Sequence, residues 1–123
     1  MTDEGAWAPK LDTISILDLL QEVVEKARED LGVKVSLGLD VAASEFFANS
    51  QYKYDNYSKE NKKRSMNRKE QLAFMELLIK RYDLKYVEDP FQQNDFESFK
   101  ELKKHLGTQM KILIDVRCLN NIL

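Results

Sequence analysis

The stretch Val33-Lys-Val-Ser-Leu-Gly-Leu-Asp40 is a short apolar run, rich in valine and leucine, that ends in an acid. Two later stretches have the same form, Leu84-Lys-Tyr-Val-Glu88 and Met110-Lys-Ile-Leu-Ile-Asp115. Runs of β-branched and large apolar residues of this length favour buried strands. We therefore predict three strands, each of which delivers one carboxylate at its C-terminal end.

The segments between these strands predict helices. Apolar residues recur at helical spacing in 13–31 and in 68–82, and again after Asn94 or Asp95, either of which can cap a third helix. A short turn or helical piece is expected at 42–47, and a polar excursion with a hairpin at 50–66. This order predicts an α/β protein with about three parallel strands and crossover helices.

Residue types at the helix ends support these bounds. Asp12 or Thr13 can cap the first helix and Gly32 can end it, while Asn67 with Glu70 predicts a capping box for the second. Gly107 is suited to end the third helix. The buried stripe of that helix is expected to consist of Phe96, Phe99, Leu102 and Leu106.

Composition excludes several classes of protein. A length of 123 residues gives one small domain, and roughly half of an eight-stranded α/β barrel, which takes about 250 residues. The net charge of −2 gives no general attraction to nucleic acid or membrane. The single cysteine, Cys118, excludes an internal disulfide and indicates a reducing compartment. No apolar run approaches the ~20 residues of a membrane span, and the acidic first residues lack an apolar signal region, so we do not expect secretion.

The three strand-end acids Asp40, Glu88 and Asp115 predict a divalent-metal site. Ligand sites of α/β proteins lie at the C-terminal ends of parallel strands. Carboxylates that converge there repel one another unless a cation lies between them, and Mg²⁺ prefers such hard oxygen ligands. The alternative is that these acids only cap helices or form turns.

Three motifs carry a resemblance to a known family. Gly38-Leu-Asp-Val-Ala-Ala-Ser-Glu-Phe-Phe47 is similar to the G-L-D-x-A-x-S-E-F motif of enolases, the phosphopyruvate hydratases of glycolysis. Val87-Glu-Asp-Pro-Phe91, followed by Asn94-Asp95-Phe96, resembles the enolase E-D-P-F segment. Asp3-Glu-Gly-Ala-Trp-Ala-Pro9 resembles the D-E-G-G/A-x-A-P loop in its archaeal form. The resemblance covers about 1–115.

The resemblance implies a chemistry for named residues. Asp40, Glu88 and Asp115 match the three carboxylates that bind Mg²⁺ in enolases, and Glu4 matches the general acid that protonates the departing hydroxyl. The family converts 2-phosphoglycerate to phosphoenolpyruvate, with a lysine as base and Mg²⁺ as cofactor. It also implies a cytoplasmic location and a homo-oligomer, although an oligomer is doubtful for a fragment. Glu45 of the S-E-F motif is expected to support structure.

The resemblance further implies that the chain is an incomplete domain. We expect 1–123 to be part of an enolase C-terminal TIM barrel, (β/α)8, without the N-terminal domain and the later strands. Residues 116–123 diverge, because Val116-Arg-Cys-Leu-Asn-Asn121 follows Asp115 where enolases read roughly D-L-x-V-T-N. No lysine in the chain matches the family's base, so we expect no enolase activity from the chain alone.

Two alternatives to an enolase fragment stay open at this stage. One is a non-catalytic remnant that serves as a binding or interaction module. The other is a fragment of another enolase-superfamily lyase, an acid-sugar dehydratase.

Other chemically active residues are expected to be structural. His105 is predicted to be a solvated or helix-end residue and Cys118 a plain thiol. The aromatic rings of Phe91, Phe96 and Phe99 are expected in the core, and Trp7 in the packing of its loop. A solvated surface is predicted for the basic cluster of Lys59, Lys62, Lys63, Arg64, Arg68 and Lys69, because no nucleic-acid motif accompanies it.

Overall fold

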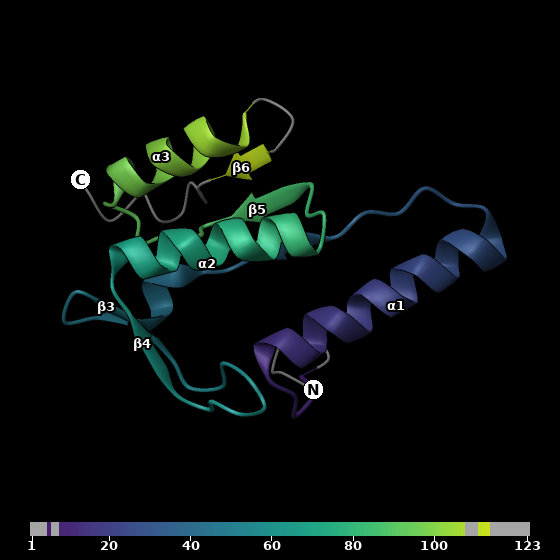
Figure 1. Ribbon diagram of the computed structural model, residues 1–123, viewed down its shortest axis with the longest axis horizontal. Coiled ribbons are helices and arrows are strands. Elements are labelled where there is room, and N and C mark those ends of the chain that lie inside the picture. The colour runs from purple at the N-terminus through teal and green to yellow at the C-terminus, as the bar shows by residue number, and fades with distance from the viewer. Residues whose placement is uncertain (1–4, 6–7, 108–110, 114–123) are drawn as a thin grey trace.

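The computed structural model describes residue 5, residues 8–107 and residues 111–113. Its elements in chain order are α1 (Thr13–Leu31), β1 (Gly38–Asp40), the 3-10 helix η1 (Ala43–Phe46), β2 (Phe47–Ala48), β3 (Gln51–Tyr54), β4 (Arg64–Met66), α2 (Arg68–Arg81), β5 (Tyr86–Glu88), α3 (Phe96–Leu106) and β6 (Lys111–Leu113) (Figure 1).

The predicted parallel sheet is confirmed. Its strands lie in the order β1-β5-β6, and both neighbouring pairs run parallel. Helix α2 lies in the connection from β1 to β5, and α3 forms the connection from β5 to β6. The chain therefore has the α/β architecture of consecutive strands joined by helical crossovers.

The polar excursion forms a second sheet. Strands β2, β3 and β4 pair antiparallel in that order, which confirms the expected hairpin between the first strand and the second helix. Tyr52 of β3 and Met66 of β4 face each other in register, and both side chains are fully buried. The excursion therefore contributes these two side chains to the core.

Local capping sets the helix bounds as predicted. Asp12 caps α1, and Gly32 ends it in the left-handed conformation at φ 64°. The capping box of α2 is complete, since Asn67 accepts from the N–H of Glu70 while the Glu70 carboxylate accepts from the N–H of Asn67. Asp95, one of the two predicted residues, caps α3.

Two strand starts and one burial prediction were wrong, and the second strand begins at Tyr86 and not at Leu84. The first strand begins at Gly38 and not at Val33, because its ladder with β5 starts at the pair Gly38 and Tyr86. Phe96 is 57% exposed and is not part of the core. The buried side chains at the start of α3 are the capping Asp95 and Ser98, so Phe96 faces outward while Phe99 and Leu102 are buried.

Helix α1 is attached mainly by its first half and extends away from the other elements (Figure 1). Tyr82 donates a hydrogen bond to Asp18 at 2.7 Å, and Arg81 pairs with Asp18 at 2.8 Å. Leu17 is the one buried residue of the helix, whereas Leu20 and Val23 are 41% and 56% exposed. The predicted apolar face of α1 is thus largely uncovered by the part of the chain that the structure describes. Among the described residues, no helix is both long and apolar enough to cross a membrane.

The cap of α1 makes the stability of the fold depend on pH. Asp12 is 5% exposed and accepts from the Ser15 N–H at 3.0 Å and the Ser15 hydroxyl at 2.8 Å. The Ser15 N–H is the main cause that holds the pKa of Asp12 below its ordinary value. Stability from this carboxylate is thus complete above the ordinary pKa, and it is lost as pH falls through the lowered folded-state pKa.

We predict that Asp12→Asn loses less stability on acidification than the wild-type chain, because asparagine caps without titrating. Urea unfolding midpoints measured from about pH 6 down to about pH 2 test this difference. Asp55→Asn, which changes an exposed acid, should follow the wild-type curve. Parallel losses in Asp12→Asn and wild type would contradict the prediction.

Candidate metal site at the strand ends

Two of the predicted site residues lie side by side. Asp40 ends β1, Glu88 ends β5, and the two residues are direct partners in the parallel register. Neighbouring strands are about 4.8 Å apart, so the two acids project from adjacent positions on one face. Asp115 and Glu4 lie outside the described residues.

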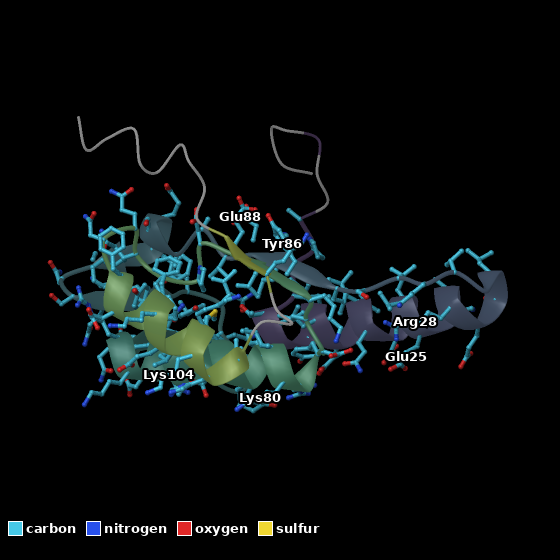
Figure 2. The ribbon with its side chains drawn as sticks, turned by 90° about the horizontal axis from the view of Figure 1, so that it is seen from above. Glu25, Arg28, Lys80, Tyr86, Glu88 and Lys104 are labelled. Atoms are coloured by element: carbon cyan, nitrogen blue, oxygen red, sulfur yellow. The ribbon has the colours of Figure 1, made fainter. Side chains whose placement is uncertain are left out.

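The two faces of this sheet differ in chemistry. Leu39 and Val87 alternate with the acids, and Val87 is fully buried. The opposite face, which we call the acid-bearing face, carries Gly38, Asp40, Tyr86, Glu88 and Lys111. Figure 2 shows Tyr86 and Glu88 on the side away from Lys80 of α2 and Lys104 of α3. The helices thus cover one face, and the polar groups gather on the other.

The two carboxylates are accessible and partly oriented. Asp40 is exposed and accepts from the N–H of Ala42 at 3.2 Å. Glu88 is half-buried, and one of its oxygens accepts from the hydroxyl of Tyr86. Adjacent carboxylates repel, and a divalent cation between them would relieve the repulsion. Oxygen donors of this kind suit Mg²⁺, so the residues present fit a hard metal ion.

A complete ligand set is not found in the described part of the chain. No group of three or more His, Cys, Asp or Glu side chains is close enough there to hold a metal ion. The third predicted acid, Asp115, follows the end of β6 at Leu113 and belongs to the residues that are not described. Two of three predicted ligands are therefore brought together, and the third stays a prediction.

The backbone just past the acids is held by further pairing. Val41 N–H donates to the carbonyl of Glu88 at 2.9 Å, and Ala43 N–H donates to that of Asp89 at 3.0 Å. Ala42 and Asp89 adopt left-handed conformations, with φ of 48° and 43°. Such conformations cost non-glycine residues of order 1–3 kcal/mol, and they persist where the surroundings fix them.

The segment that follows Glu88 is anchored by side chains from other elements. Buried Gln71 of α2 donates to the carbonyl of Pro90 at 2.8 Å and accepts from Tyr54. The hydroxyl of Tyr52 accepts from the N–H of Gln92 at 3.0 Å. Sequence reasoning missed both anchors. For Gln71 a signal existed, since it lies at helical spacing with Phe74, Met75 and Leu78 and so falls on the apolar side of α2.

A buried acid lies behind this segment. Asp95 is 2% exposed and accepts from the Ser98 hydroxyl at 2.8 Å, while Arg68 pairs with it at 3.4 Å. Tyr52 donates to the same carboxylate at 3.5 Å. Burial raises the pKa of Tyr52 above its ordinary value, so the hydroxyl stays protonated and keeps this bond. The Asp95 carboxylate therefore has a structural role, in which it joins α3, α2 and β3.

The structure places several of the residues that were expected to be structural. His105 is exposed in the last turn of α3 and contacts the Glu76 carboxylate of α2. The basic cluster is largely solvated, although Arg64 lies 4.9 Å over the ring of Tyr57. Glu45 is exposed. Cys118 and Trp7 lie outside the described residues.

A cavity of about 260 Å³ lies beside Asp40, between β1, α2 and the start of α1. Its lining is mostly apolar: Leu39, Val41, Phe46, Phe74, Met75 and Leu78, with Thr13, Asp40 and Tyr54 as the members that carry polar side chains. A phosphate ester needs cationic groups or N–H donors around it. This cavity therefore does not suit an anionic ligand.

Comparison with known proteins identifies the family of this sequence. The sequence profile described as "Enolase, C-terminal TIM barrel domain" matches residues 1–122. An enolase of Pyrobaculum aerophilum is 44% identical over 101 residues, which are 82% of this chain and 23% of that protein. The enolase of Archaeoglobus fulgidus is 40% identical over 104 residues, 85% of this chain and 24% of that protein.

A third relative extends over more of the sequence. The enolase of Halorubrum lacusprofundi is 37% identical over 120 residues, or 98% of this chain and 29% of that protein. The chain thus spans about a quarter of the length of the relatives it matches. The expected resemblance to archaeal enolases is confirmed.

We predict that Gln71→Leu lowers the free energy of unfolding by about 1–3 kcal/mol, because it leaves the buried carbonyl of Pro90 without its donor. Urea denaturation measures this loss. Gln21→Leu is a matched control, since the Gln21 amide bonds only the exposed Glu25 among described residues, and it should change stability by less than about 0.5 kcal/mol. Equal stability of Gln71→Leu and wild type would contradict the anchoring role.

Proposed function

Since the chain belongs to the family of enolase C-terminal TIM barrel domains, we propose that it supplies part of the metal site of an enolase. In this proposal Asp40, Glu88 and Asp115 bind Mg²⁺, and the enzyme dehydrates 2-phosphoglycerate to phosphoenolpyruvate in the cytoplasm. The observation that carries the proposal is the direct pairing of Asp40 with Glu88 at the C-terminal ends of β1 and β5.

The roles of the residues follow from their chemistry. Asp40 and Glu88 present carboxylate oxygens on the acid-bearing face, where Asp40 is exposed and Glu88 is half-buried. A divalent ion bound there would stabilise negative charge that develops on the substrate in the transition state. Glu4 would hold the proton that the departing hydroxyl receives. No lysine of the chain matches the family's base, so the proton on carbon has no acceptor within this chain.

We predict that the chain binds Mg²⁺ and that Asp40→Asn or Glu88→Gln each weakens binding at least about tenfold, the lower end of losses at metal sites. Isothermal titration calorimetry measures the affinity directly. Asp30→Asn removes an exposed acid from the end of α1 and should leave the affinity unchanged. Similar weakening in all three variants would indicate general charge screening and would contradict a site at Asp40 and Glu88.

We predict that the chain alone does not turn over 2-phosphoglycerate. A missing general base costs about 10²–10⁴ in rate, so activity should be at least about a hundredfold below that of a whole enolase. A coupled assay for phosphoenolpyruvate tests this. Adding a complementing chain with the N-terminal domain and the lysine-bearing strands should restore turnover. Failure to restore it would favour a non-catalytic remnant, and activity of the chain alone would refute the assignment of roles.

A further inference from the structure

Tyr86 lies next to a proposed metal ligand on the same strand. It precedes Glu88 by two residues on β5, so both side chains leave the same face of the sheet. Figure 2 shows the two side chains together on the acid-bearing face. The Tyr86 hydroxyl donates a hydrogen bond to Oε2 of Glu88. This contact uses one carboxylate oxygen, Oε2, and does not involve Oε1.

The position of the Tyr86 ring depends on a glycine. Gly38 is the register partner of Tyr86 on β1. A Cβ at position 38 would lie 3.2 Å from Cβ and 3.3 Å from Cδ1 of Tyr86, which is tighter than nine in ten real contacts of this kind, so the ring would have to shift by a few tenths of an ångström. The absence of a side chain at Gly38 therefore lets the ring pack closely beside β1, in the place from which its hydroxyl reaches Glu88.

We propose that Tyr86 is a positioning residue for Glu88, and that Gly38 provides the space it needs. The inference rests on the proposed function, because it concerns a divalent cation bound by Asp40 and Glu88. A glutamate has three rotatable side-chain bonds, and holding one oxygen limits the directions of the other. The hydrogen bond orients the carboxylate before the cation arrives. Partners that orient metal ligands in this way are common behind metal sites.

The first test is Tyr86→Phe, which keeps the ring and removes only the hydroxyl. Calorimetric titration with Mg²⁺ should show affinity about 10–100-fold weaker than that of the wild-type chain. Tyr82→Phe is the matched control. The Tyr82 hydroxyl also donates to a carboxylate, that of Asp18, but on α1 and away from the acid-bearing face. Tyr82→Phe should keep the wild-type affinity for Mg²⁺, whatever it does to the melting temperature.

Gly38→Ala provides a second, independent perturbation. The added methyl group should displace the Tyr86 ring and weaken Mg²⁺ binding while the hydroxyl is still present. Both variants act through one hydrogen bond. The double variant Gly38→Ala/Tyr86→Phe should therefore bind Mg²⁺ about as tightly as the single variant that has the lower affinity. Independent effects, which multiply in the double variant, would contradict a shared route through Tyr86.

A measurement without metal separates positioning from folding. The ¹³C resonance of the Glu88 carboxyl carbon should move in Tyr86→Phe and stay in place in Tyr82→Phe. If Tyr86→Phe binds Mg²⁺ as tightly as wild type, the inference about Tyr86 is overturned and the proposed function stands. If the wild-type chain itself binds no Mg²⁺, the proposed function and this inference are both overturned.

Discussion

The in-register pairing of β1 with β5 is the interaction on which the candidate site depends. It matches Leu39 with Val87 on the helix-covered face and Asp40 with Glu88 on the acid-bearing face. A slip of one residue would turn one acid toward the helices and one apolar side chain away from them. The burial of Val87, which is complete, thus fixes the same register that brings the two carboxylates together. Core packing and the candidate metal site are consequences of one pairing.

The segments after the two strands explain why their ends can turn so sharply. Ala42 and Asp89 hold left-handed conformations that L-residues rarely adopt. They lie one or two residues beyond an acid, where the chain must leave the sheet without removing the carboxylate from its face. The segment that follows Glu88 is held in place by Gln71, which donates to it, and by Tyr52 and Ser44, which accept from its N–H groups. Side chains of α2, η1 and β3 thus fix the backbone that follows Glu88.

Features that depend on neighbours in sequence could be predicted, and features that depend on distant neighbours could not. The capping box of Asn67 and Glu70 joins residues three apart, and it is found as predicted. The start of β1 depends on where β5 begins, so the prediction placed it too early. The anchors Gln71 and Tyr52 bond to partners 19 and 40 residues away. The proximity of Asp40 and Glu88 could be predicted from the sequence pattern alone, because the C-terminal ends of parallel strands lie at the same edge of the sheet.

Two motifs that look separate in the sequence are coupled in the fold. Gly38 belongs to the G-L-D motif, and Tyr86 immediately precedes the V-E-D-P-F motif, yet they face each other across the sheet. A side chain at Gly38 would press on the Tyr86 ring, so the residue allowed at one position depends on the other. Both lie on the acid-bearing face, whereas Leu39 and Val87 pack toward the helices. Because Glu88 and the buried core residues lie on opposite faces, a change on the acid-bearing face can alter affinity at the proposed metal site with little effect on the core.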